Sequence, residues 1–213
     1  MIEPRTFCLV GMVRFMQVDS LSGRVKHKRD RAMTERKDNE LSKQSHGLNI
    51  TGKMRRVLLA EQPDGGSFVA REDEIEPATF PGIGQLYTLW GTDAVIELPD
   101  CGNVPVFEGT FPPVGGFRIF LTRFAPSEDA LSGGGDMPDN LKNIPSASDM
   151  HSSATVDCNL LLSGTLDCML SDGSVVTLQA GEMIVLNGAE HAWQNNSSNE
   201  ATMLFFMTGA SRE

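Results

Sequence analysis

The sequence predicts an all-β protein, and three observations support this. Turn signals rich in Gly, Asn, Asp and Ser recur through residues 150–209. The segments between them are short and apolar, and hydrophobic residues between 55 and 125 show little helical periodicity. Strands spaced evenly at about 8 to 10 residues are typical of a sandwich, barrel or jelly roll.

The strands can be placed along the chain from the turn signals. In the second half we expect six strands, at residues 156–162, 165–170, 175–178, 182–186, 191–194 and 201–207. In the first half we expect four more, at 55–61, 67–70, 85–91 and 116–124. Between the two halves, residues 126–149 are rich in Ser, Gly, Asp and Pro, which predicts a mobile flap rather than part of the core.

Charge divides the chain into two regions. Residues 1–58 hold 13 Lys and Arg against 6 Asp and Glu, whereas residues 59–213 hold 5 against 22. The stretch 24–43 has too few large apolar residues to offset the entropy of ordering it. We therefore expect residues 1–52 to be a basic extension, disordered or partly helical, and residues 53–213 to form one folded domain. The acidic domain argues against nucleic acid as a partner.

The sequence also bears on location. No run reaches the roughly 18 apolar residues needed to cross a bilayer, so no membrane contact is expected. The N-terminus lacks the pattern of a secretory signal, which predicts a cytoplasmic protein. Cys158 and Cys168 could face each other on neighbouring strands, but we favour two unpaired thiols in a reducing compartment.

One group of polar residues is suited to binding a metal. His151, Ser153, Thr155 and Asp157 alternate, so on an extended strand they project from one face. His191 follows a glycine turn later in the chain. Two imidazoles and one carboxylate converging inside a barrel would suit Fe(II), and Mn, Ni or Zn as well.

The spacing of these residues resembles the motifs of the cupin superfamily. The first cupin motif is G(X)5HXH(X)3-4E(X)6G, and His151, Asp157 and Gly164 match its spacing, with Ser153 in place of the second His and Asp in place of Glu. The second motif, G(X)5PXG(X)2H(X)3N, is matched by residues 181–195, one residue shorter and without the Pro. The stretch 162–207 looks much like small stand-alone cupin-2 proteins, and residues 55–125 resemble their upstream half.

This resemblance implies a jelly-roll barrel, the double-stranded β-helix, over residues 53–213. It implies a divalent metal (Fe, Mn, Ni or Zn) held by His151, Asp157 and His191, and a homodimer. The other two histidines, His27 and His46, lie in the extension. The barrel therefore supplies two imidazoles at most, with Ser153 as a weak or water-mediated fourth ligand.

The resemblance implies an enzyme of small-molecule metabolism. The first hypothesis is a metal-dependent oxidoreductase or dioxygenase acting on an aromatic, polyketide-like or small carboxylate metabolite, as in secondary metabolite biosynthesis. An isomerase, lyase or decarboxylase in the same pocket is the alternative, with Asp157 as base and His191 as its acid partner. Ser153, Trp193 and Phe120 are the expected substrate-pocket residues. A non-catalytic binding barrel and an interaction protein recruited through the extension are two further alternatives.

Overall fold

The computed structural model describes residues 50–62, 64–80, 82–98, 102, 106–127, 145–146 and 148–212. These stretches contain eleven strands and no helix, so the expected all-β class is confirmed. No helix in the described part of the chain could therefore span a bilayer. The expected extension up to residue 49 and most of the expected flap, residues 128–144 and 147, lie outside the described residues.

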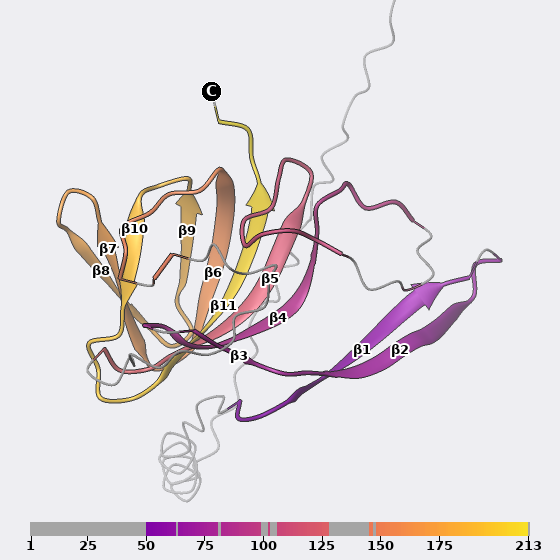
Figure 1. Cartoon of the computed structure of the whole chain (residues 1–213), viewed down its shortest axis with the longest axis horizontal. Coiled ribbons are helices and arrows are strands. Elements are labelled where there is room, and N and C mark those ends of the chain that lie inside the picture. Colours follow the sequence, from indigo (N-terminus) through magenta and orange to yellow (C-terminus); the bar gives the residue numbers. More distant parts are fainter. Residues whose placement is uncertain are drawn as a thin grey trace, which may run out of the picture. The chain divides into compact units, whose positions relative to one another are not determined.

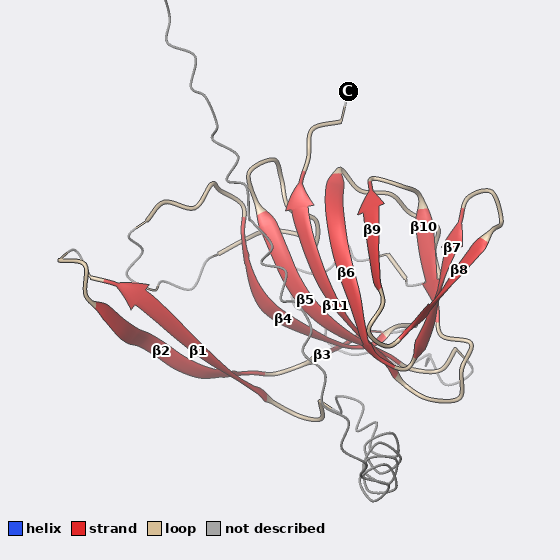
Figure 2. Ribbon diagram, turned by 180° about the vertical axis from the view of Figure 1, so that it is seen from behind, coloured by secondary structure: helices blue, strands red, loops and turns tan. Residues whose placement is uncertain are grey.

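The strands form three antiparallel sheets (Figures 1 and 2). A hairpin pairs β1 (Met54–Glu61) with β2 (Ser67–Ile75). A three-stranded sheet has the order β10 (His191–Gln194), β7 (Thr165–Leu170), β8 (Val175–Gln179). A six-stranded sheet has the order β3 (Ala78–Phe80), β4 (Gly84–Thr92), β5 (Phe117–Phe124), β11 (Ala201–Gly209), β6 (Thr155–Ser163), β9 (Met183–Asn187).

All ten expected strands are present. Their ends shift by one or two residues, except that β2 runs on to Ile75, five residues beyond its expected end. Strand β3 was not expected from the sequence, because its three residues are too few to show a period. Residue 116, which was expected to begin this strand, lies before β5. Its backbone N–H donates to the Pro113 carbonyl in a turn.

Alternation along β6 separates the interior from the outer face. Thr155, Asp157, Asn159 and Leu161 are buried, while the residues between them, Cys158 among them, are half-buried. This period of two is the expected pattern for a strand with one face on a core. The core is built from the inward residues of both larger sheets: Phe80, Ile83, Leu86, Phe120, Phe124, Leu161, Leu166, Cys168, Leu178, Leu186, Trp193, Ala201, Met203 and Met207.

The turn between β6 and β7 needs the glycine that the motif places there. Gly164 has φ of 80°, a left-handed conformation that side chains disfavour. A Cβ at this position would lie 2.7 Å from the Glu200 carbonyl oxygen and 2.8 Å from the Ala201 Cα. The motif glycine thus lets β6 turn into β7 beside the start of β11.

The two described cysteines are unpaired, as favoured from the sequence. Cys168 lies in the core on β7, where burial raises the pKa of its thiol to about 11. Cys158 lies on the outer face of β6, paired across the strands with Val185 and Phe206. The two thiols therefore occupy different sides of the fold, and Cys168 behaves as a small core residue.

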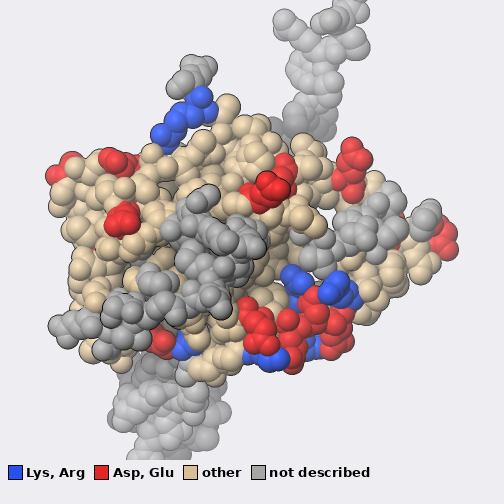
Figure 3. All heavy atoms as spheres, viewed as in Figure 1, with Lys and Arg blue, Asp and Glu red and all other residues tan. Residues whose placement is uncertain are grey.

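Charged side chains are concentrated on the hairpin, as the face in Figure 3 shows. Arg56 makes a two-point ion pair with Asp73, at 2.9 and 2.7 Å. The same guanidinium donates to the Leu89 carbonyl at 3.0 Å and lies 5.2 Å from the centre of the Trp90 ring. These contacts tie β1 to the outer side of β4.

Candidate functional site

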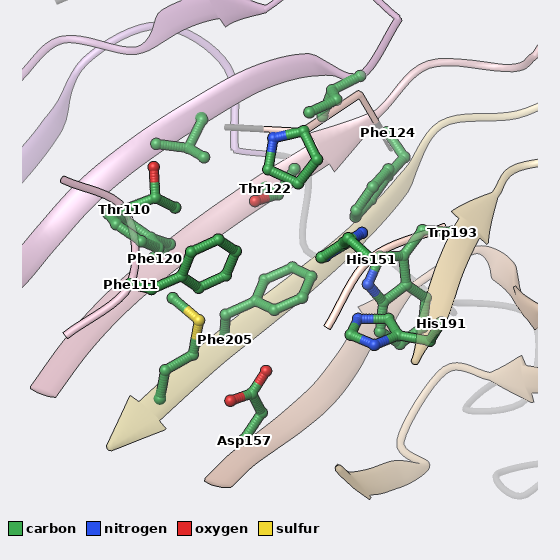
Figure 4. Close-up of a pocket in the computed structure, with 14 residues that line it drawn as sticks. Thr110, Phe111, Phe120, Thr122, Phe124, His151, Asp157, His191, Trp193 and Phe205 are labelled. Atoms are coloured by element: carbon green, nitrogen blue, oxygen red, sulfur yellow. The ribbon is translucent and has the colours of Figure 1, made fainter. Parts of the chain in front are cut away.

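The candidate site is a cavity of about 80 Å³ between the six-stranded and three-stranded sheets (Figure 4). This volume is several times the roughly 10–15 Å³ that one water molecule requires. Most of its wall is apolar: Ile83, Leu86, Phe111, Phe120, Phe124, Pro145, Trp193, Phe205 and Met207. Its polar lining consists of Thr110, Thr122, His151, Asp157 and His191.

The structure brings the two predicted histidines together. His151 lies in the segment before β6 and forms an isolated antiparallel bridge with His191, the first residue of β10. Each backbone N–H donates to the other residue's carbonyl at 2.9 Å. The two ring centroids are 4.6 Å apart, and Figure 4 shows the imidazoles at one end of the cavity.

Both imidazoles are oriented by their own backbone. Nδ1 of His151 lies 2.8 Å from the Asp149 carbonyl oxygen, and Nδ1 of His191 lies 2.9 Å from that of Ala189. Because a carbonyl only accepts, each Nδ1 carries a proton and donates. In a neutral ring this leaves Nε2 as an unprotonated acceptor, and neither Nε2 has a hydrogen-bond partner among the described residues.

Burial keeps His191 neutral. Its side chain is 4% exposed, and burial lowers its pKa against an opposing hydrogen bond to the Ala189 carbonyl. The charge of His151 lowers this pKa further. A neutral imidazole in an apolar cavity is suited to accept a proton near neutral pH.

Asp157 lies apart from the imidazoles, on the inner face of β6 between Met207 of β11 and Leu186 of β9 (Figure 4). It is 4% exposed, and its Oδ1 has no hydrogen-bond partner. Burial raises the pKa of this carboxyl, while a hydrogen bond from Thr155 and the charge of His151 oppose the shift. Perturbed titratable groups in a cavity are typical of functional sites.

The other predicted pocket residues fall in different places. Phe120 and Trp193 line the cavity, and Trp193 meets His191 edge-on with ring centroids 5.5 Å apart. Ser153 is not among the lining residues. Its hydroxyl is 2.6 Å from that of Thr155, and burial alternates from His151 through Ser153 to Asp157, so the expected single face is present although β6 begins only at Thr155.

The imidazole and carboxylate groups of the cavity can be compared with the ligands that the expected metal requires. Two imidazoles with Nδ1 bonded to carbonyls have the arrangement usual for metal-binding histidines. The described residues, however, contain no group of three His, Cys, Asp or Glu side chains placed to hold a metal ion. Asp157 lines the same cavity as the imidazoles but does not complete such a group. The described side chains therefore do not form a three-ligand metal centre in this arrangement.

Several residues of the site were not predicted from sequence. Thr110 and Phe111 lie in the loop before β5. Arg118 of β5 binds this loop through hydrogen bonds to its backbone carbonyls. Its side chain is fully buried, ion-paired with Asp93, and donates to the carbonyls of Thr92, Phe117, Glu108 and Gly109. The only sequence signal for Arg118 was its position in the alternation of β5. An Arg that points inward on an apolar strand requires a buried partner.

Asn159 was also missed. It is fully buried two residues after Asp157 on the same face of β6, and neither its amide nitrogen nor its amide oxygen has a hydrogen-bond partner. Thr110 Oγ1 is unpartnered as well. Asp157, Asn159 and Thr110 thus carry buried unsatisfied polar atoms, which native cores normally avoid.

The strand order identifies the fold. Taking β5, β11, β6 and β9 from the larger sheet and β10, β7 and β8 from the smaller one gives the two antiparallel layers of a double-stranded β-helix, with the His151 segment bridged to the edge of β10. The described strands therefore have the order of the jelly-roll barrel expected from the sequence. No family model and no curated protein matches the chain.

Solved structures similar to the chain include two proteins described as cupin-2 domains and one ethanolamine utilization protein. The Cupin_2 domain of an XRE family transcriptional regulator from Enterobacter cloacae matches 45% of this chain and 83% of its own at 18% identity, TM-score 0.31. A cupin 2 conserved barrel domain protein from Salinispora arenicola matches 44% and 64% at 19% identity, TM-score 0.32. A putative ethanolamine utilization protein from Salmonella typhimurium matches 76% and 100% at 11% identity, TM-score 0.37.

Proposed function

We propose that this barrel is a small-molecule enzyme of the cupin type that transfers a proton within its cavity, as in an isomerase or lyase. The observation that supports this most is the pair of adjacent imidazoles with unprotonated Nε2 atoms at one end of an apolar cavity. The low dielectric strengthens a hydrogen bond to such an acceptor, while burial lowers the pKa of His191 and so favours the unprotonated Nε2 near neutral pH.

The proposed roles follow from the environments. His191, neutral through burial, takes a proton from the bound molecule at Nε2. Asp157, whose pKa burial raises, serves as the second group that exchanges a proton with the molecule. His151 lies beside His191 with the two ring planes tilted by 49°, and accepts a hydrogen bond from the same part of the ligand.

Exchange of carbon-bound hydrogen tests this proposal. Acetophenone in D2O would be followed by proton NMR, with wild type, His191→Gln and Asp157→Asn compared at equal concentration. We expect wild type to accelerate deuteration of the methyl group and both variants to lose at least about tenfold, the lower end of the contribution of a positioned acid or base. Equal rates in wild type and both variants, with binding intact, would contradict proton transfer.

A second candidate is the metal-dependent oxidoreductase expected from the sequence, favoured by the carbonyl-bonded Nδ1 atoms of both histidines. Elemental analysis of the purified protein would show one Fe, Mn, Ni or Zn per chain, lost in His151→Ala and in His191→Ala. Asp157→Glu, one methylene longer, should then increase metal retention. Metal content equal in all these variants would rule out this site.

The expected homodimer has one supporting feature. The outer face of the six-stranded sheet exposes Met183 and Val185 of β9 and Phe206 of β11, the two strands that flank β6. We propose this face as the contact between two copies. Sedimentation equilibrium of the full chain should give twice the chain mass, and Val185→Glu should reduce it to the monomer mass.

A further inference from the structure

We infer that the cavity is specific for a neutral, single-ring aromatic molecule carrying a hydroxyl group, and that it discriminates against carboxylates. This inference rests on the proposed function, because it names the ligand class of the same cavity. It follows from the kinds of hydrogen-bonding atoms that the wall presents and from the shape of the apolar part.

Three of the five polar side chains that line the cavity present acceptor atoms, and the hydroxyls of Thr110 and Thr122 can donate or accept. Whenever either ring is neutral its Nε2 is an acceptor, since Nδ1 donates to a backbone carbonyl in both His151 and His191. Oδ1 of Asp157 is buried without a partner, and an ionised carboxylate only accepts. A molecule that brings a hydroxyl donor satisfies atoms that are otherwise left unpaired, which is the stronger basis for selectivity.

Cationic side chains are absent from the part of the wall that the structure describes. None of the described lining residues is Lys or Arg. The buried Arg118 is occupied by Asp93 and backbone carbonyls. A carboxylate ligand would lose its hydration and face the lone pairs of Asp157 and both imidazoles without a compensating charge.

The apolar wall fits a planar ring. Phe205 meets Trp193 edge-on at 5.9 Å between centroids and lies 6.1 Å from Phe124. Phe111 completes the wall at 6.2 Å from the His151 ring. Aromatic rings at such spacings prefer edge or offset contacts with a further ring, and a cavity of about 80 Å³ limits the ligand to roughly one ring.

The test compares four single-ring ligands of similar size: phenol, anisole, benzoate and benzylammonium. Binding is followed by the fluorescence of Trp193 in a Trp90→Phe background, because Trp90 is the other tryptophan and lies outside the cavity lining. We expect phenol to bind about 5- to 20-fold more tightly than anisole, the range given by one hydrogen bond to a strong acceptor. Benzoate should bind more weakly than anisole, because it must bury a negative charge among acceptor atoms. Benzylammonium can donate to the same acceptors but must bury a charge, so it should bind more weakly than phenol.

Variants connect the selectivity to the acceptors. In His151→Gln and in Asp157→Asn the ratio of phenol to anisole affinity should fall toward one. Cys158→Ser, on the outer face of β6, is the matched control and should keep the ratio. A circular dichroism spectrum equal to that of wild type shows that each variant is folded.

The outcomes separate the two proposals. Tighter binding of phenol, lost in both acceptor variants, supports the ligand class. Saturable binding in which benzoate or benzylammonium is tightest, or in which phenol and anisole are equal, overturns the ligand class and leaves the proposed function standing. If none of the four ligands changes the Trp193 fluorescence or shows saturable binding by calorimetry, the cavity takes no such molecule and both proposals fail.

Discussion

His151 and His191 are each other's backbone partners as well as ring neighbours. Both N–H groups donate across the bridge at 2.9 Å, and the ring centroids are 4.6 Å apart. Because the backbone bridge fixes both residues, the relative position of the two rings does not depend on contact between the rings. The position of each imidazole therefore depends on whatever holds the two segments together.

Arg212 is one such residue. It donates to the Gly188 carbonyl at 2.7 Å and to the Ser153 carbonyl at 3.0 Å, so it joins the turn before His191 to the segment after His151. Arg212→Ala should change the ring titration of both histidines, measured by NMR, while lowering the free energy of unfolding by only about 0.5–1.5 kcal/mol. Glu190→Gln, in the same turn, is the control. Unchanged titration curves in Arg212→Ala would show that the bridge alone positions the rings.

His191 should make stability depend on pH. Its pKa is lowered from 6.5 by burial, so the unfolded chain binds its proton more readily than the folded one. The resulting stability is present above about pH 6.5 and is lost as pH falls through the lower, folded value. Urea unfolding of wild type and His191→Gln between about pH 5 and 8 measures this. The wild-type free energy should decline faster toward acid, and parallel curves would contradict the assignment.

Asp157 should act in the opposite sense. Burial raises the pKa of its carboxyl from 3.8, so its contribution is greatest below that value and is lost as pH rises through the folded pKa. Asp157→Asn removes the buried charge and should raise the free energy of unfolding near pH 7 by about 1–3 kcal/mol. The gain should shrink at acidic pH. A destabilised Asp157→Asn at neutral pH would mean that the carboxylate has a partner in solution.

Removing the ion pair between Arg118 and Asp93 should lower the free energy of unfolding. Asp93→Asn leaves the buried guanidinium without its counter-charge. Because the Asp93 side chain is one-third exposed, water partly replaces that charge, and we expect a loss of about 1–3 kcal/mol in the free energy of unfolding. Arg118 also anchors the carbonyls of Glu108 and Gly109, so the loop carrying Thr110 and Phe111 should loosen and phenol binding should weaken. Asp64→Asn, at an exposed turn in the hairpin, is the control. A loss equal to that control would contradict a buried ion pair.

Asn159 offers a gain in stability. Both amide atoms are buried and unpartnered, so Asn159→Leu, of similar size, should raise the free energy of unfolding by about 1–3 kcal/mol. Chemical denaturation of wild type and Asn159→Leu measures it, with Asn196→Leu at the exposed β10–β11 turn as control. A destabilised Asn159→Leu would reveal a bound water or ligand on the amide, and its affinity for phenol would then be measured.

The strands and the candidate site residues follow from local patterns in the sequence. Alternation of apolar residues in β5 and β6 is a local property of the chain, and Gly164 is required by a turn whose conformation few other residues adopt. Because motif spacing is local too, the spacing of His151, Asp157 and His191 was enough to predict that all three line the barrel.

How those residues meet depends on pairing between distant segments. The His151–His191 bridge brings two imidazoles together, whereas Asp157 on β6 lies between its register partners on β9 and β11. Neither register nor the reach of one side chain toward another is encoded in a local period. The same reason explains why Arg118, Asn159 and the loop with Thr110 were missed, because their surroundings come from segments distant in sequence.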